Sequence, residues 1–433
     1  MNTFTLAPRE MYMEKLMHVL HNDNVVFLIG VRRSGKTCIA AEFEEALRNK
    51  IKDNGKVVRY NFEAIEEGRI TAERMISFFE NSYDHDGMNY IILGEITHVD
   101  DWETAINYIC SYNNCKLILC SSHMRVISQN LDAVRNNRYD VIRVLPMSLP
   151  EFIAFHGFEE VTDEKTPILE KRFRRFNGKE YSLAEVYRSH LVYGGLPIVK
   201  SEYMDPERAW VMMDGTYSAI VTRDVFEVGS ANGMSAVTDP LLLRSVIKIM
   251  AKSMGENITA TGVGRQTADY LVHPSTTKTI ESYMRALLNA NLFYISERYD
   301  LKAEQTLKTY AKYYIADTGL YRYLNGMGPN DDLKLLENKV YFELLRRGYS
   351  VCNGKYGRDD ICLVARNSYG RVYIQVALGT EDIEAKLAPL RRIRDSYPKV
   401  VLVLNVASGI LHDGVVVLNA MEFLMGSIWS YPA

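Results

Sequence analysis

The octapeptide GVRRSGKT at 30–37 constrains the fold of this chain more than any other feature. It matches the pattern GxxxxGK[ST], and it follows the apolar run VVFLIG at 25–30 and precedes a helix-like segment. In that setting, the backbone N–H groups of the loop and the helix N-terminus point at a common centre and favour phosphate oxygens. The alternative is a chance glycine-rich turn between a strand and a helix. The context favours a nucleotide site.

Within this loop, Lys36 is expected to reach the β- and γ-phosphates of a nucleotide, and the Thr37 hydroxyl is expected to bind Mg²⁺. ATP and Mg²⁺ are therefore the predicted cofactors, although the motif alone does not separate ATP from GTP. The predicted nucleotide-binding residues are Gly30, Arg32, Arg33, Ser34, Gly35, Lys36 and Thr37.

A second apolar run, YIILG at 90–94, is followed by Glu95. In a nucleotide-hydrolysing domain, such a strand normally ends in Asp-Glu. The aspartate holds the magnesium water shell, and the glutamate orients the attacking water. Here Gly94 stands at the aspartate position, and Glu95 is the predicted catalytic base. The alternative is a buried strand that ends in an ordinary capping carboxylate.

The next apolar run, KLILCS at 116–121, ends in Ser121 and is followed by Ser122. A strand can also end in serine for no catalytic reason. A serine at this place can contact the γ-phosphate or the attacking water, and Ser122 is the predicted catalytic residue. Arginines neutralise charge in the transition state of phosphoryl transfer. Arg138, Arg143 and Arg223 are candidates for that role, and Arg138 is the one assigned to the site. A surface ion pair is the alternative for each of them.

Strand-like and helix-like segments alternate along the first part of the chain, which predicts a parallel sheet covered by helices on both faces. The predicted strands are 25–30, 57–62, 90–94, 116–121 and 141–145, and the clearest predicted helices are 36–50 and 72–81. Residues 147 to about 235 have a largely helical pattern.

The pattern changes after residue 240. Three helical segments, the last opened by Ser275 as a predicted N-cap, are followed by strand-like runs at 292–299 and 312–316. Three helices and then a β-ribbon is the order of a winged helix. A helix at 333–348 and several short strands predict a small α/β domain at the C-terminal end. The predicted domains are 1–235 (P-loop sheet with a helical extension), 236–325 (winged helix) and 326–433 (small α/β domain).

Composition excludes some classes of protein. The 433 residues include 51 Lys and Arg against 54 Asp and Glu, a net charge of -3, so no overall basic excess indicates a nucleic-acid binder. The six cysteines form no CxxC pair, and the opening MNTFTLAPREMYMEKL does not have the pattern of a secretory signal. No uncharged apolar run approaches the ~18 residues of a membrane span. The predicted location is cytoplasmic, away from membranes.

Several motifs together resemble a prokaryotic family of AAA-like P-loop ATPases that have a C-terminal domain of unknown function. The resemblance spans almost the whole chain. Its motifs are REMYMEKL (9–16), GVRRSGKT (30–37), NFE (61–63), GEITHVDDWETAI (94–106), RVLPMSLPEF (143–152), GGLPIV (194–199), RDV (223–225), KYYIADTGL (312–320) and LLENKVYFELLRRGY (335–349).

This resemblance implies an ATPase domain, a winged helix and a C-terminal fold similar to restriction-type nucleases. The chain departs from the family pattern at several positions. Gly94 replaces an aspartate that binds magnesium. In the nuclease-like part Glu337 remains, but Asp360 and Cys362 stand at the family's glutamate and aspartate positions. Gln375 and Ala377 stand where an active nuclease has an acid and a lysine. Because Mg²⁺-dependent cleavage needs carboxylates, nuclease activity is disfavoured.

Two functional hypotheses follow. In the first, the chain is an ATPase whose hydrolysis resets a conformational switch coupled to the winged helix. In the second, it binds ATP with little hydrolysis and uses nucleotide occupancy to fix a surface that binds DNA or protein. For DNA, the candidate contacts are Lys278 and Arg285 on the last helix of the winged helix. Packing, a protein partner and a homo-oligomer are the alternatives for that surface.

Overall fold

The structure of this chain is a computed structural model. It describes residues 9–22, 25–51, 55–62, 70–198, 204–227, 237–267, 275–328 and 330–427. Contacts between residues divide the chain into two compact units. The first unit comprises Met1–Pro146, Thr216–Ala236 and Asn289–Leu292, and the second comprises Met147–Gly215, Val237–Leu288 and Phe293–Ala433.

The first unit contains a five-stranded sheet in the order β2-β4-β6-β1-β7, and every neighbouring pair is parallel. Its strands are β1 (Val25–Ile29), β2 (Gly55–Asn61), β4 (Met88–Gly94), β6 (Cys115–Ser121) and β7 (Tyr139–Arg143). All five strands were predicted from the apolar runs. The α/β fold class with a parallel P-loop sheet is therefore confirmed.

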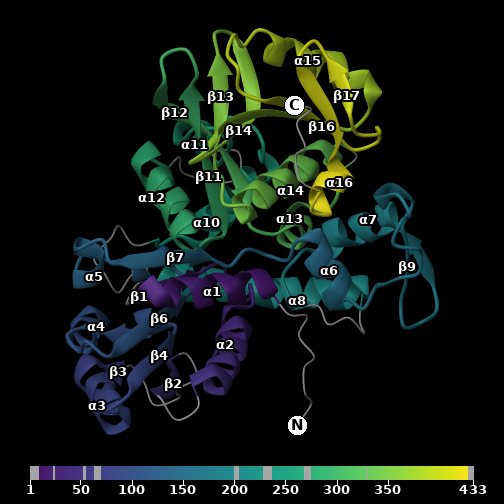
Figure 1. The fold of residues 1–433 in the computed structure, drawn as a ribbon. Helices are drawn as coiled ribbons and strands as arrows, with labels where there is room; N and C mark the ends of the chain where they lie inside the picture. The colour runs from purple at the N-terminus through teal and green to yellow at the C-terminus, as the bar shows by residue number, and fades with distance from the viewer. Residues whose placement is uncertain are drawn as a thin grey trace. The chain divides into compact units, whose positions relative to one another are not determined.

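Helices cover both faces of this sheet (Figure 1). The helices are α1 (Glu10–Asn22), α2 (Lys36–Ile51), α3 (Ala72–Ser82), α4 (Trp102–Cys110) and the short α5 (Asp132–Arg135). Because side chains alternate along a strand, Phe27 faces α3 and α4 whereas Leu28 faces α1 and α2. Each face buries an apolar cluster. Smaller elements are β3 (Ile70–Thr71), β5 (Val99–Asp100), η2 (Ile96–His98) and η3 (Met124–Val126).

The second unit contains an eight-stranded mixed sheet in the order β12-β11-β13-β14-β15-β16-β18-β17. Its strands are β11 (Phe293–Asp300), β12 (Gln305–Ile315), β13 (Ser350–Tyr356), β14 (Asp359–Asn367), β15 (Gly370–Ala377), β16 (Lys399–Val403), β17 (Ile410–His412) and β18 (Val415–Asn419). A separate small antiparallel sheet has the order β10-β9-β8 and is formed by β8 (Glu159–Glu160), β9 (Arg172–Arg174) and β10 (Glu180–Ser182).

The helical elements of the remaining chain include those predicted after residue 240. They are α6 (Leu149–Phe155), η4 (Ile168–Glu170), α7 (Leu183–Tyr193), α8 (Pro206–Ala219), η6 (Ile220–Glu227), α10 (Pro240–Lys252), α11 (Ala260–Thr267), α12 (Thr277–Asn289), α13 (Thr318–Asn325), α14 (Asp332–Arg346), η7 (Thr380–Asp382), α15 (Ile383–Arg391) and α16 (Ala420–Leu424). The predicted N-cap Ser275 is wrong by one residue. The Thr276 hydroxyl oxygen accepts from the Thr279 N–H at 3.2 Å, so Thr276 caps α12.

The compact units do not follow the predicted domain boundaries. Residues 147–215 belong to the second unit, although they were predicted to extend the P-loop domain. The ribbon β11–β12 is hydrogen-bonded to β13, so a boundary at 325 separates strands of one sheet. The order of three helices and a ribbon is present at 240–315. The winged helix, the nuclease-like fold and the boundaries themselves stay predictions.

Candidate functional site

The loop 30–35 leaves the carboxyl end of β1 and leads into α2. A Cβ atom on Gly30 would lie 2.1 Å from the Val144 carbonyl oxygen, so only glycine fits beside β7 at this point. Gly35 has a φ of 99°, a left-handed conformation that glycine adopts without strain. Arg33 also has a positive φ, 65°. The two glycines of the motif thus curl the backbone as a phosphate-binding loop requires.

Lys36 begins α2 and turns back into this loop. Its Nζ donates to the carbonyl oxygens of Gly30 at 2.9 Å and Val31 at 3.2 Å. The same Nζ lies 3.9 Å from Oε1 of Glu95. Burial lowers the pKa of Lys36, and the Glu95 carboxylate partly opposes that shift. The amine is therefore buried inside the loop, and its ion pair with Glu95 is too long for a hydrogen bond, whereas the Thr37 side chain is exposed in the first turn of α2.

Glu95 follows β4 and is the buried acid of the site. Its backbone is left-handed, with φ 49°, and its N–H donates to the Cys120 carbonyl oxygen at 2.8 Å. Its Oε2 accepts from the Ser122 N–H at 3.1 Å and lies 3.1 Å from the Ser122 hydroxyl. The structure thus brings together two of the three residues predicted to be catalytic.

Asp224 completes this group, and the sequence analysis did not select it. It lies in the π-helix η6 and accepts from Arg32 through both carboxylate oxygens, at 2.9 and 2.8 Å. Its Oδ1 also accepts from the Ser122 hydroxyl at 2.7 Å. A hydroxyl has one proton, so the shorter contact assigns that proton to Asp224 and leaves the Ser122 N–H to Glu95. In the sequence, Asp224 is part of the motif RDV at 223–225, whose Arg223 is a predicted candidate for charge neutralisation.

Two further side chains fix the backbone around this group. The Arg9 guanidinium donates to the carbonyl oxygens of Ser34 at 2.8 Å and Leu145 at 2.7 Å. The Asn291 amide donates to the Ser122 carbonyl oxygen at 2.8 Å. Both side chains are buried. They hold the loop and the end of β6 from segments that are distant in sequence.

The remaining loop residues differ in how their side chains are used. Arg33 is exposed, and its Nη1 donates to the Thr216 hydroxyl at 3.1 Å. Ser34 is fully buried, and within the described part of the chain its hydroxyl has no hydrogen-bond partner. A buried unpartnered hydroxyl costs free energy, so a ligand that bonds to it gains relative to the empty loop.

Arg138 is not brought to this site. It is exposed and directly precedes β7, which runs parallel to β1 with Val25 opposite Tyr139 and Ile29 opposite Arg143. The loop leaves the other end of β1, roughly 16 Å away at about 3.3 Å per residue. Within one chain, Arg138 therefore lies at the edge of the sheet opposite to the loop.

Gly94 has a clear structural partner. It pairs in register with Asn61 of β2, and a Cβ atom on Gly94 would lie 3.1 Å from Asn61 Oδ1 and 3.3 Å from its Cγ. The space beside the main chain is thus occupied by an asparagine side chain. The described residues contain no group of three or more His, Cys, Asp and Glu that could hold a metal ion. Thr37 and Glu95 still supply oxygen donors, which fits Mg²⁺ that is held largely by phosphate oxygens and water.

Comparison with known proteins assigns the region that contains this site. Residues 22–153 match a family model described as an AAA domain. The region that contains the site is therefore similar to AAA domains. A second family model, described as a domain of unknown function (DUF8612), matches residues 184–331. The predicted resemblance to AAA-like ATPases with a further domain of unknown function is confirmed.

Whole-chain relatives extend beyond the AAA domain. An uncharacterized protein of Haemophilus influenzae is 27% identical over 429 residues, which are 97% of this chain and 99% of that protein. Among solved structures, the Walker-type ATPase PABY2304 of Pyrococcus abyssi has a TM-score of 0.48 at 15% identity and covers 74% of this chain and 96% of its own. Cdc6p of Pyrobaculum aerophilum has a TM-score of 0.31 at 14% identity and covers 72% of this chain and 92% of its own.

Outside the AAA domain, Glu337 of α14 is the acid predicted for a nuclease-like centre. It is buried, and its Oε1 accepts from Lys312 Nζ at 2.8 Å and from the Tyr314 hydroxyl at 2.6 Å. Burial by itself lowers the pKa of Lys312, but the nearby Glu337 carboxylate raises it, and the pKa lies above its ordinary value. The Gln375 amide donates to the Asp360 carbonyl oxygen at 3.0 Å. A lysine and a tyrosine thus satisfy the buried Glu337 carboxylate.

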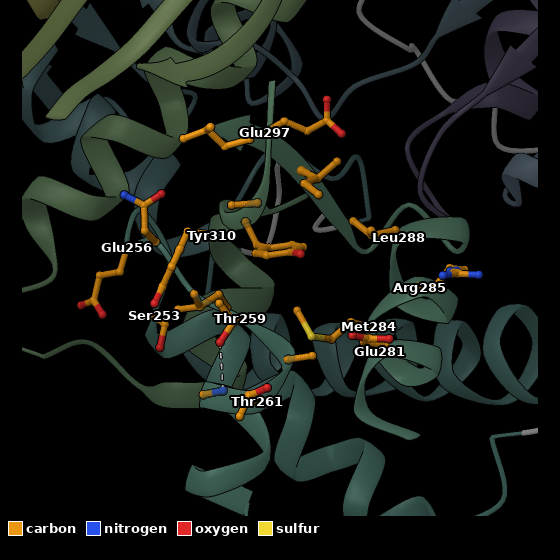
Figure 2. A pocket seen from close by; sticks show the side chains of 18 of the residues that line it. Ser253, Glu256, Thr259, Thr261, Glu281, Met284, Arg285, Leu288, Glu297 and Tyr310 are labelled. Atoms are coloured by element: carbon orange, nitrogen blue, oxygen red, sulfur yellow. Dashed lines mark hydrogen bonds between the residues drawn. The ribbon is translucent and has the colours of Figure 1, made fainter. Parts of the chain in front are cut away.

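A groove of about 1180 Å³ lies among the predicted winged-helix elements in the second unit. Figure 2 shows Glu281, Met284, Arg285 and Leu288 projecting from α12 at its border. The charged residues that line the groove are Glu256, Glu281, Glu297, Arg265 and Arg285. The acids outnumber the bases. Lys278, the other candidate DNA contact, is exposed and is not among the lining residues.

No described helix of the AAA domain or of the rest of the chain is long and apolar enough to span a bilayer.

Proposed function

We propose that this chain binds ATP with Mg²⁺ in the loop 30–37 and hydrolyses it, and that occupancy of the loop drives a conformational switch. The observation that supports this most is the convergence of Lys36, Glu95 and Ser122 at the carboxyl ends of three neighbouring parallel strands. In an AAA domain this is the edge where nucleotide chemistry takes place. Arg32, Arg33, Ser34 and Thr37 complete the proposed loop contacts.

Each residue has a proposed role. Lys36 exchanges its two carbonyl partners for phosphate oxygens, a stronger charge-assisted interaction. Thr37 places its hydroxyl on Mg²⁺, and the metal supplies charge stabilisation to the γ-phosphate when bound. Glu95 orients the attacking water. The Ser122 N–H fixes one oxygen of Glu95 and leaves Oε1, 3.9 Å from Lys36 Nζ, for that water.

The route of the proposed switch follows covalent continuity. Asp224 lies in η6, which continues α8, and α8 contains the boundary between the two units at residues 215 and 216. Asn291 lies two residues beyond α12, and the segment 289–292 belongs to the first unit whereas the rest of α12 belongs to the second. Both side chains bond to Ser122. A change around Ser122 therefore reaches two segments that continue into the second unit.

A second candidate function is ATP binding with little hydrolysis, and Gly94 favours it. Where a hydrolysing domain places an aspartate for the magnesium water shell, this chain has a glycine with the Asn61 side chain beside it. In that case nucleotide occupancy alone sets the switch.

For the surface that the switch controls, we propose a protein partner. DNA binding relies on a phosphate-facing basic surface, but three glutamates and two arginines line the groove beside α12. A second copy of the chain is an alternative partner, because the exposed Arg138 would be available only to a neighbouring molecule. Binding to a DNA duplex that weakens with salt and is lost on charge removal at Lys278 and Arg285 would overturn the preference for protein.

Steady-state phosphate release by the full-length protein tests the proposed function. Lys36→Ala is expected to abolish turnover. Lys50→Ala, the same substitution at the exposed last turn of α2, is the matched control and is expected to keep it. Turnover that survives Lys36→Ala would contradict the proposal. ATP binding without turnover in the unmodified protein would select the second candidate.

A further inference from the structure

The loop residue Arg32 forms a buried ion pair with Asp224. Arg32 is the third residue of the motif, and its side chain is turned away to a carboxylate 192 positions later in the sequence. Both side chains are almost fully buried, at 7% and 1% exposed. The contact is bidentate, the strongest geometry for a guanidinium and a carboxylate.

A buried ion pair has a large desolvation cost and is weak evidence for a purely stabilising role. This pair also occupies the donors that a nucleotide would use, because a guanidinium binds phosphate through the same planar fork. Lys36 Nζ bonds to carbonyls of its own loop, and the buried Ser34 hydroxyl has no partner in the described chain. The loop is thus closed on itself.

We propose that Asp224 is a positioning residue that holds Arg32 away from the nucleotide, and that phosphate groups displace it when ATP binds. This inference rests on the proposed function and adds its regulation. Arg32 then exchanges one bidentate anion for another, and no bond is made or broken other than hydrogen bonds. The exchange removes the guanidinium from Asp224 and leaves the Ser122 hydroxyl as its remaining partner among the contacts described above.

The exchange links the loop to the segment that contains Asp224. While Arg32 is paired, η6 is tied to the loop through the guanidinium and to β6 through Ser122. Once phosphate takes Arg32, only the Ser122 contact of that relay remains. Nucleotide occupancy therefore weakens the hold on η6, which continues into α8. The ion pair between Arg32 and Asp224, here called the lock, thus opposes ATP binding. Removing the Asp224 carboxylate is therefore expected to strengthen ATP binding.

The test measures the affinity of the full-length protein for a non-hydrolysable ATP analogue with Mg²⁺ by calorimetry. Asp224→Asn keeps the shape and removes the charge, and we expect the Kd to fall roughly tenfold because Arg32 is released. Arg32→Gln is expected to weaken binding. Lys50→Gln, at the exposed last turn of α2, is the control and is expected to leave the Kd unchanged.

If Asp224 only stabilises the fold, Asp224→Asn is expected to raise the Kd for the ATP analogue instead of lowering it. That result would overturn the lock. Because an unpaired Arg32 can destabilise the fold, the double variant Arg32→Gln with Asp224→Asn provides a second comparison without either charge. Since Asp224 is proposed to act through Arg32, the double variant is expected to bind like Arg32→Gln alone. A difference between those two would also overturn the lock. Lys36→Ala separates the two claims: if it leaves binding intact, the proposed function itself fails.

Discussion

Two buried lysines, Lys36 in the first unit and Lys312 in the second, differ in the partners of their amines. In the AAA domain, Lys36 is held by two carbonyl oxygens, and its nearest carboxylate oxygen is 3.9 Å away. In the second unit, Lys312 lies 2.8 Å from Glu337, whose same oxygen also accepts from Tyr314. The first lysine meets its carboxylate at a distance too long for a hydrogen bond. The second already has its counterion.

The difference teaches which buried charge is available to a ligand. Phosphate offers Lys36 a better partner than carbonyl oxygens do, so binding is favoured over the empty state. A metal or phosphate approaching Glu337 would have to break an ion pair and a hydrogen bond that are already formed. The opposite pKa shifts of the two lysines agree with this. Burial is the largest influence on the pKa of both, but at Lys312 the Glu337 carboxylate and the other nearby acidic groups together outweigh it.

The largest expected effect is on turnover. Glu95→Gln keeps the contact with the Ser122 N–H but removes the base, and we expect phosphate release to fall by about 10²- to 10⁴-fold. ATP affinity is expected to stay close to that of the unmodified protein. Glu337→Gln, at the buried acid of the other unit, is the control and is expected to leave the rate unchanged. An equal loss of phosphate release in both variants would contradict the claim that only the acid beside the loop takes part in hydrolysis.

The next largest effect is on stability. Lys312→Met leaves Glu337 buried and unpaired, and we expect the free energy of unfolding to fall by about 3–5 kcal/mol. Lys36→Met removes a charge that burial disfavours, so its effect in the absence of nucleotide is expected to stay within about 1 kcal/mol. Urea denaturation followed by circular dichroism measures both. A larger loss for Lys36→Met would show that its charge is structural.

A smaller effect concerns the missing acid. Gly94→Asp alone places a Cβ atom 3.1 Å from Asn61 Oδ1, so the substitution is best made with Asn61→Ala. If the absent aspartate limits hydrolysis, the double variant is expected to raise Mg²⁺-dependent turnover by roughly tenfold. Asn61→Ala alone is the control. An unchanged rate in the double variant would remove Gly94 as the explanation for slow hydrolysis.

The smallest effect comes from a third lysine, the half-buried Lys339. Lys339 lies 2.9 Å from His190 Nε2, and burial lowers its pKa to about 7. Between that value and 10.5 the unfolded chain binds the proton and the folded chain does not, so stability rises with pH. The expected gain is about 1 kcal/mol between pH 7 and pH 8. Thermal unfolding at the two pH values measures it, and Lys339→Met is expected to lose the rise. A rise that persists in Lys339→Met would assign it to other groups.

The sequence predicted what depends on local pattern. Apolar runs identified the five parallel strands, and the loop motif followed from glycines whose necessity the structure explains at Gly30 and Gly35. The contact between Glu95 and Ser122 follows because carboxyl ends of adjacent parallel strands share one edge. These inferences need only neighbours in sequence or in the sheet.

What the sequence did not reveal depends on long-range packing. Asp224 contacts residues 102 and 192 positions away, and a single acid in a helical segment has the pattern of an exposed residue. The contact between Lys312 and Glu337 is not visible in the sequence for the same reason, because the two residues are 25 positions apart, on a strand and on a helix. For Arg138, the edge of the sheet on which a residue lies decides whether its side chain can reach the loop, and the sequence does not show that edge.

The most direct test of the account is ATP binding to the full-length protein, measured by calorimetry with and without Mg²⁺. The account predicts one ATP per chain, tighter binding with Mg²⁺ and loss of binding in Lys36→Ala while Lys50→Ala binds normally. Absence of binding in the unmodified protein, or equal affinity in Lys36→Ala, would contradict it.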